Sequence, residues 1–493
     1  LPKAGKPLDE LDKRRDICLQ PHGLKLLMNG LKPAHNAAAR GVQPESNAGF
    51  ETARTPQETQ LAVKLLQETA LRQRRNFYIG FTDKKGFFQS IVRRMQRSAE
   101  AECGVPPSVT AIILALHESL TVAYDSGEGY THGAEGGTGN GQGDTVAPVR
   151  SMEVLAFETR AIDWLVVGYK TWGPEWITRG RCPQVWFADD EAVMTESAHM
   201  MQVAYTVASM MSRALEFGIG VETNLPTGGR VTKTGTMGLE WIKGEAKEWQ
   251  GADEMELVDG TKVPMISGWY KHVGYIMEAT GGYGRQRRKV VSQCQGITWA
   301  LSRLGILTAA QFVEVVDTAT TAIIAYHGAA APIGEEACEQ IDKTKRKALA
   351  QLGHRGIGTS RWLAHAPAPM GMGMALSFPH AAAALAVEMD RATRAPPGRP
   401  NRVAAAAATG ETAYTWGWRP RKGNSTPAAW NAGAAEQALG EESLVEARHK
   451  YLAMAGISMR EAMGDGGRDE LAKEWITGAG QSHGGAIAPR AAC

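Results

Sequence analysis

Several classes of protein are disfavoured by what the sequence lacks. The six cysteines form no Cys-x-x-Cys pair, which leaves zinc ribbons and zinc knuckles without support and fits a reducing compartment. No run of about 18 apolar residues predicts a membrane span, and no signal peptide opens the chain. No internal repeat occurs either. From these absences we expect an intracellular protein, cytoplasmic or nuclear, without a membrane partner.

The chain also lacks a strong net charge, although its basic residues are unevenly placed. It has 54 Lys and Arg against 52 Asp and Glu, a net charge of +2, but the first 100 residues hold 18 basic and 10 acidic side chains. Two short basic clusters follow at 285–289 and 343–347. Local patches of this kind can neutralise phosphates. The alternative for each cluster is the solvated face of a charged helix.

The length of 493 residues and the hydrophobic content of 43% allow at least two buried cores. Apolar spacing predicts both helices and strands. The expected helices are 57–75, 152–165, 198–217, one starting at Pro106-Pro107 with Ile112 and Ile113 facing inward, and a mainly helical stretch from 285 to 390. The expected strands are 77–81, 184–186, 192–194 and 269–276. Residues 127–143 are too rich in glycine for regular structure.

The most informative pattern is a pair of acids between two apolar runs. The tetrapeptide 187–190 reads Phe-Ala-Asp-Asp and is expected to form a hairpin turn that carries Asp189 and Asp190. Far upstream, Asp83 ends the apolar run at 77–81. Nucleotidyl transfer needs carboxylates that hold two magnesium ions against the attacking and leaving oxygens, and Asp83, Asp189 and Asp190 supply them. The alternative for the Asp-Asp pair alone is an ordinary solvated turn.

A glycine-rich loop, Gly-Asn-Gly-Gln-Gly-Asp at 139–144, lies between these acids. The order of acid, Gln-Gly loop and Asp-Asp hairpin resembles the reverse transcriptases. The segments at 43–54 and 326–328 are similar to those of the non-LTR retrotransposon branch. The resemblance is strong over 1–280, weaker to 390 and absent afterwards. It implies a divergent, N-terminally truncated RNA-directed DNA polymerase in a ribonucleoprotein, with an RNA template, a DNA primer and dNTPs as partners.

The resemblance also assigns roles to individual residues. Asp83, Asp189 and Asp190 would be catalytic and would bind two Mg²⁺ ions, or Mn²⁺ in their place. Lys233 would be catalytic as well, because a lysine there can protonate the departing pyrophosphate. The residues that would bind the substrates are Lys3, Arg15, Phe88, Gln142 and Gly143.

Each of these five substrate-binding roles has a physical reason. Lys3 and Arg15 would contact the triphosphate, where arginine gives bidentate hydrogen bonds. Phe88 would lie beneath the sugar and exclude a 2′-hydroxyl. Gln142 would pack against template and incoming base, and the missing side chain of Gly143 would let the backbone approach them.

The fold that the resemblance implies is α/β (α+β), the right-hand polymerase architecture of fingers, palm and thumb with a mainly helical C-terminal region. The fingers would span 1–75 and the palm with fingers insertions 76–280. A helical thumb and post-thumb region would span 281–393. The rest, 394–493, would be a linker and a poorly defined helical tail.

Two other classes stay open. The first is a decayed or domesticated copy that binds nucleic acid without catalysis. Gln89, where the family has an acid, and the lengthened spacing before Lys233 favour it, whereas three intact aspartates oppose it. The second is an RNA-dependent RNA polymerase, which Phe88 disfavours because its ring would clash with a 2′-hydroxyl.

Overall fold

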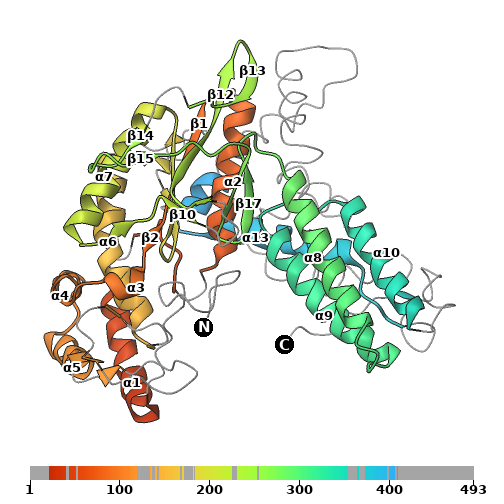
Figure 1. Cartoon of the computed structure of the whole chain (residues 1–493), viewed down its shortest axis with the longest axis horizontal. Coiled ribbons are helices and arrows are strands. Elements are labelled where there is room, and N and C mark those ends of the chain that lie inside the picture. The colour runs from red at the N-terminus through yellow and green to blue at the C-terminus, as the bar shows by residue number, and fades with distance from the viewer. Residues whose placement is uncertain are drawn as a thin grey trace.

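Figure 1 shows a computed structural model of the chain, in which a central sheet, smaller antiparallel strand pairs and groups of helices form a mixed α/β fold. The residues that the structure describes are 21–39, 44–51, 54–118, 121–122, 134–135, 139–140, 144–166, 169–170, 181–182, 184–224, 230–251, 255–352, 364–365, 372–396, 399–405 and 408. Lys3, Arg15, Gln142 and Gly143 lie outside them, as does almost all of the predicted tail at 394–493.

The central sheet has five antiparallel strands in the order β13-β12-β1-β8-β7. All six residues of β1 are buried, as expected for a central strand that is covered on both faces. The strands predicted at 77–81, 184–186 and 192–194 are confirmed. The bounds are β1 Phe77–Thr82, β7 Gln184–Phe187, β8 Asp190–Thr195, β12 Gly235–Ile242 and β13 Glu245–Glu248.

The two faces of the sheet bury different cores, because successive side chains of a strand point to opposite sides. Phe77, Ile79 and Phe81 pack into a core with the leucines of α2, whereas Tyr78 packs into a second core with α6 and α7. Gly80 lets α7 approach closely: a Cβ there would lie 2.5 Å from the Sδ of Met201. The sheet therefore separates an α2 side from an α6–α7 side.

The helices around the sheet agree largely with the predictions. Side-chain oxygens of Thr55 and Ser197 cap the first turns of α2 and α7. The helix expected to face Ile112 inward is rotated, since Ile112 is 44% exposed whereas Ile113 is fully buried. The bounds are α1 His22–Ala39, α2 Pro56–Gln73, α3 Phe87–Ser90, α4 Arg93–Glu102, α5 Pro107–Glu118, α6 Ala147–Leu165 and α7 Ala198–Ala214.

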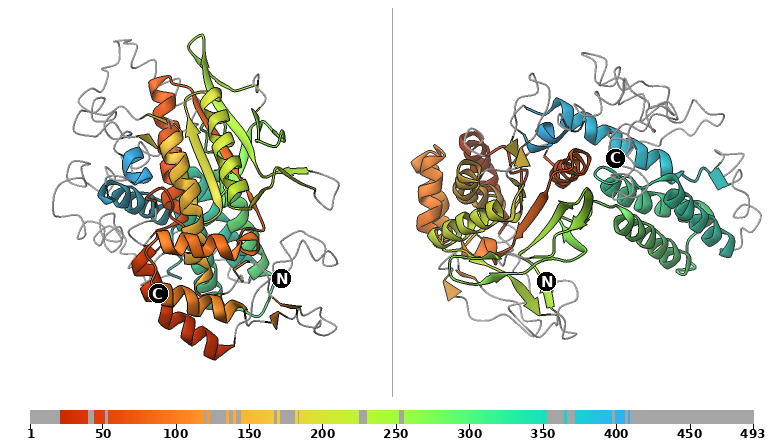
Figure 2. Two further views of the ribbon diagram at one scale, coloured as in Figure 1. Left: turned by 90° about the vertical axis from the view of Figure 1, so that its left-hand side faces the viewer. Right: turned by 90° about the horizontal axis from the view of Figure 1, so that it is seen from above.

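A helical bundle follows the sheet and lies to one side of it, as the view from above shows (Figure 2). The mainly helical stretch predicted at 285–390 is confirmed. Within the basic cluster at 343–347, however, Lys345 is 1% exposed and pairs with Asp317 at 3.1 Å, so this lysine does not belong to a cationic surface. The bounds are α8 Gly284–Ser302, α9 Ala309–Gly328, α10 Glu335–Gln351 and α13 Ser377–Arg394.

The stretch predicted as one strand at 269–276 is a hairpin of β16 (Trp269–His272) and β17 (Tyr275–Glu278). Val273 and Gly274 form its two-residue turn with φ angles of 44° and 82°, values that match the twist of a hairpin. The Tyr326 hydroxyl of α9 donates to the Val273 carbonyl at 3.0 Å, which fastens the turn to the bundle.

The other described strands pair two by two, and one of them, β4, falls inside the stretch at 127–143 for which no regular structure was predicted. Their bounds are β2 Lys84–Lys85 with β9 Gly218–Ile219, β3 Thr121–Val122 with β4 Ala134–Glu135, β5 Tyr169–Lys170 with β6 Arg181–Cys182, β10 Glu222–Asn224 with β11 Arg230–Thr232, and β14 Met255–Glu256 with β15 Lys262–Val263. Among the described residues, no helix has both the length and the apolar character needed to cross a membrane.

Candidate active site

The register of the central sheet brings two of the predicted acids to neighbouring strand ends. In the antiparallel pair of β1 and β8, Thr82 lies opposite Glu191, so the next residues along each strand are Asp83 and Asp190. The β7–β8 hairpin pairs Phe187 with Asp190 and leaves Asp189 in the turn. Asp83, Asp189 and Asp190 therefore gather at one edge of the sheet, although the first is far away in sequence.

The turn that carries Asp189 is held in place from outside the hairpin. Ala188 has a φ of 59°, which few residues other than glycine adopt. Beside it, Ala48 donates its backbone N–H to the Trp186 carbonyl at 2.9 Å. Gly49 lies directly against the turn, since a Cβ there would be 2.2 Å from the backbone nitrogen of Ala188. These contacts fix the position of the turn relative to the sheet.

Lys233 is the fourth predicted catalytic residue that the structure brings to this edge. Its Nζ lies 2.7 Å from Oδ2 of Asp83, and both side chains are partly exposed. The neighbouring Thr234 accepts the Asp83 backbone N–H through its hydroxyl at 3.0 Å. The lysine therefore reaches the acids despite the lengthened spacing before it.

The electrostatics of this edge oppose full ionisation of the acids. Burial raises the pKa of Asp190 to about 7, and the charges of Asp189 and Asp83 add to the rise while Lys233 acts against it. Burial likewise raises the pKa of Asp189. The Asp190 side chain is nevertheless exposed, and solvent screens part of the repulsion between these charges. A cation placed among these carboxylates would offset their mutual repulsion.

The β16–β17 hairpin lies against the same edge of the sheet. Tyr270 stacks on Phe81 with ring centroids 4.2 Å apart, and its hydroxyl donates to the Lys233 carbonyl at 2.6 Å. His272 is fully buried, and burial lowers its pKa to about 3, so it is neutral at pH 7. Tyr270 and His272 therefore supply a neutral, aromatic border to the acids.

Phe88 lies in the short helix α3, five residues beyond Asp83. It is half-buried, and its ring meets Phe50 edge-on at 6.1 Å. The Asn140 backbone N–H donates to the Phe88 carbonyl at 2.7 Å, which ties the described start of the glycine-rich loop to α3. The placement beneath a nucleotide stays a prediction, as do the roles of the four residues outside the described part of the chain: Lys3, Arg15, Gln142 and Gly143.

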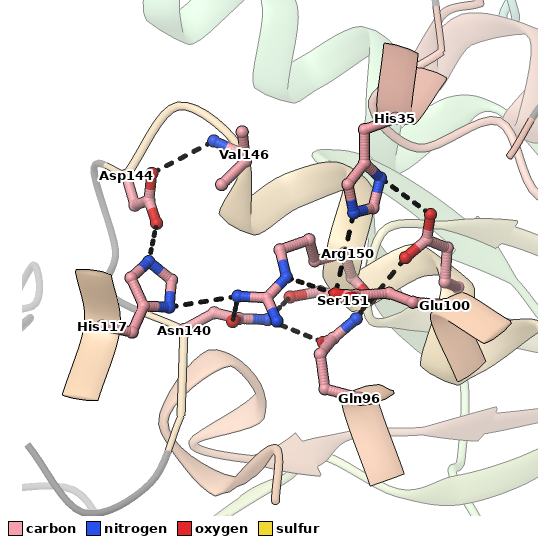
Figure 3. Close-up of polar contacts among 10 residues, drawn as sticks. His35, Gln96, Glu100, His117, Asn140, Asp144, Val146, Arg150 and Ser151 are labelled. Carbon is pink, nitrogen blue, oxygen red and sulfur yellow. Dashed lines mark hydrogen bonds and ion pairs between the residues drawn. The ribbon is translucent and has the colours of Figure 1, made fainter. Parts of the chain in front are cut away.

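Among the described residues, one set of three potential metal ligands has its donor atoms within 4.8 Å of one another, namely His35, Glu100 and Glu153. The three aspartates do not meet that distance. Figure 3 shows His35 and Glu100 within a larger network of polar contacts. His35 Nδ1 lies 2.9 Å from Glu153 and Nε2 lies 3.6 Å from Glu100. One imidazole cannot offer both nitrogens to one ion.

Charge balance also favours an ion-pair network over a metal site here. Arg150 donates to Glu100 and contacts His117 at 3.0 Å, so two carboxylates face two cationic groups when His35 is protonated. Burial by itself lowers the pKa of His35, but the contacts with the carboxylates of Glu100 and Glu153 outweigh it and raise the pKa to about 9. Burial also raises the pKa of Glu153, which favours the neutral acid and therefore opposes a charged pair with His35. The 2.9 Å contact supports the charged pair.

We expect this network to make the stability of the protein depend on pH. The folded-state pKa of His35 is raised from 6.5 to about 9, so its stabilisation is complete below pH 6.5 and is lost as pH rises through 9. The shift corresponds to roughly 3 kcal/mol. Between pH 6 and pH 9.5, the free energy of unfolding of the wild type, measured with urea, should fall by this amount relative to that of His35→Gln. Parallel pH profiles of the two proteins would contradict the assignment.

Sequence reasoning missed the buried charges beneath the acids. Lys84 and Glu191 follow Asp83 and Asp190 directly and point to the opposite face of the sheet, where both side chains are 0% exposed. Glu158 of α6 completes the set. Burial together with Glu158 raises the pKa of Glu191 to about 8, although Lys84 opposes this. The alternation of side chains along a strand could have revealed them. If each motif acid points to one face of the sheet, the charged residue that follows it points to the opposite, buried face.

Comparison with known proteins gives limited similarity. No protein-family model matches the chain, and no curated protein does. Among solved structures, telomerase from Candida tropicalis matches with a TM-score of 0.32 and 10% identity over 78% of this chain and 56% of that one. Telomerase from Candida albicans matches with a TM-score of 0.30 and 8% identity over 69% and 54%. Both were solved with a fragment of telomeric RNA. The chain spans little more than half the length of either telomerase chain.

Proposed function

We propose that the chain is an RNA-directed DNA polymerase of the non-LTR retrotransposon kind, which extends a DNA primer on an RNA template. The observation that carries the proposal is the register of β1 and β8, because it gathers Asp83, Asp189 and Asp190 at one edge of the sheet. In this proposal the sheet with α2, α6 and α7 is the palm of a right-hand fold. The bundle after 281 is the thumb and post-thumb region, and the fingers lie within 1–75.

Two Mg²⁺ ions, or Mn²⁺ in their place, suit this set of donors. Magnesium prefers hard oxygen ligands, and the three aspartates offer only carboxylate oxygens. The raised pKa values of Asp189 and Asp190 reflect burial and mutual repulsion, which a bound cation offsets. When bound, the ions would neutralise charge on the reacting phosphate and activate the primer hydroxyl. Asp83, Asp189 and Asp190 would hold them.

Other residues would act on the substrates. Lys233 carries an ammonium beside Asp83 and would give its proton to the departing pyrophosphate. Arg15 and Lys3 would bind the triphosphate of the dNTP, and Gln142 with Gly143 would pack against template and base.

The nucleic-acid partners would bind along the basic side of the bundle. Arg285 and Arg288 are exposed on α8, and Lys271 is exposed in the hairpin that borders the acids. Such a surface makes binding fall steeply with salt, because phosphate contacts release counterions. The working form would be a cytoplasmic or nuclear ribonucleoprotein.

A second candidate function is nucleic-acid binding without catalysis. Two observations favour it: Lys233 already pairs with Asp83, and the donor atoms of the three aspartates do not converge within 4.8 Å. Primer extension separates the two functions. A polymerase extends a DNA primer on an RNA template in the presence of Mg²⁺ and loses this activity in Asp189→Ala. Salt-sensitive binding by folded protein, with no extension by wild type, would establish the second function and end the first.

The choice of sugar gives a further test of the proposal. If Phe88 lies beneath the nucleotide, Phe88→Val should admit ribonucleotides, because the space for a 2′-hydroxyl opens. We expect the ratio of dNTP to rNTP incorporation to fall by about tenfold or more, the size of one lost steric discrimination. Phe87→Leu is the matched control, because Phe87 is 3% exposed and packs in the core. An unchanged ratio in Phe88→Val would assign Phe88 to the core as well.

A further inference from the structure

A group of fully buried charged side chains lies directly behind the acids, on the other face of the sheet. Asp83 and Asp190 point to the α2 side of the sheet, and their neighbours Lys84 and Glu191 point to the α6–α7 side. The side chains of Lys84, Glu158 and Glu191 are all 0% exposed. They therefore touch neither solvent nor any substrate of the proposed reaction.

Lys84 is the centre of this group. Its ammonium pairs with Glu158 of α6, contacts the Ser212 hydroxyl of α7 at 3.0 Å and lies 4.0 Å from Glu191 of β8. It also lies 5.6 Å from the ring centre of Trp186 on β7, within the range of a cation–π contact. One side chain thus joins the end of β1 to both strands of the Asp-Asp hairpin and to two helices.

The location of these charges is informative because burying them is costly. Apolar residues of the same size often stabilise a core as well or better, so a buried ion pair by itself is weak grounds for stability. In this group, Lys84 directly follows Asp83 in the sequence, and Glu191 directly follows Asp190. Thr82 extends it by donating to Glu191 across the two strands. The group fixes the strand ends at the point where the acids emerge.

We propose that Lys84, anchored by Glu158, is a positioning residue that sets the separation of Asp83 and Asp190 and hence the affinity of this edge for divalent cations. The inference rests on the proposed function, and it goes beyond it by placing part of the cation affinity on the far side of the sheet. Removing groups that orient metal ligands typically costs 10–100-fold in affinity, and we expect a loss of that order here.

The test measures cation binding directly, apart from polymerase activity. Mn²⁺ is titrated into the purified full chain, with free Mn²⁺ followed by electron paramagnetic resonance, and the thermal midpoint is recorded. The variant is Lys84→Met/Glu158→Gln, which removes both charges and keeps both volumes. The matched control is Lys345→Met/Asp317→Asn, which removes another ion pair with a buried lysine, in the bundle. We expect weaker Mn²⁺ binding by about 10–100-fold in the first and none of this change in the second.

The outcomes are distinct. Wild-type Mn²⁺ affinity in a folded Lys84→Met/Glu158→Gln protein would overturn the inference. If that variant does not fold, Ser212→Ala replaces it, because it removes the hydroxyl contact of Lys84 and leaves both charges in place. Several-fold weaker binding supports the inference, and unchanged binding overturns it. Equal Mn²⁺ binding by wild type and Asp189→Ala would instead refute the proposed function itself.

Discussion

Asp189→Ala is expected to abolish primer extension while nucleic-acid binding survives. The substitution removes a carboxylate from the point where charge develops on the transferring phosphate. The loss of one preorganised electrostatic group costs on the order of 10²–10³-fold in rate, and we expect at least that. Binding depends instead on distributed cationic side chains such as Arg285 and Arg288. Single-turnover extension and a filter-binding isotherm on the same preparation measure the two quantities separately.

Asp259→Ala is the matched control for this experiment. Asp259 is also an aspartate in a turn, and its carboxylate accepts the Thr261 backbone N–H at 2.9 Å on the exposed surface. Its removal should leave extension within about twofold of wild type, as is usual for surface substitutions. Equal extension by wild type and Asp189→Ala would show that the turn does not take part in the chemistry.

Gly49→Ala is expected to reduce extension by about 100-fold, the effect of misplacing a catalytic group by about 1 Å. The added Cβ would lie 2.2 Å from the nitrogen and 2.7 Å from the Cα of Ala188. Both are backbone atoms, so the turn that carries Asp189 must move. Single-turnover extension at saturating dNTP measures the loss, and circular dichroism shows whether the fold persists.

The glycine control separates local displacement from general damage. Gly30 lies in α1, where an added Cβ meets nothing within 4 Å, so Gly30→Ala should keep full activity and gain slightly in helix propensity. Retention of wild-type extension by Gly49→Ala would mean that the contact between 46–49 and the turn does not fix the position of Asp189.

The elements that local pattern specifies were predicted well from the sequence. The short runs at 77–81, 184–186 and 192–194 are mainly apolar and lie beside acids, so the type and the approximate ends of β1, β7 and β8 follow from the local sequence. The β16–β17 hairpin was predicted as one strand because its turn begins at Val273. A β-branched residue rarely adopts a positive φ, and no Asn-Gly or Asp-Gly pair marks the reversal.

Features that depend on tertiary contacts could not be predicted in the same way. A run of basic residues in a helix does not show which side chains face the protein interior. Lys345 faces inward and pairs with Asp317. Ile112 was placed in the core for the same reason, since one apolar stretch fits several rotations of a helix. The pairing of Lys84 with Glu158 joins residues that are 74 positions apart, beyond the reach of any local periodicity.

The register that gathers the acids also has a consequence for how the protein folds. Thr82 and Glu191 are 109 positions apart, and Asp83 and Lys233 are 150 apart. Closing loops of this length has an entropic cost that must be met before the contacts stabilise anything, and high contact order slows folding. During synthesis β1 emerges long before β8 and β12, the strands that flank it. The three acids can therefore come together only after β8, which ends at Thr195, has been made.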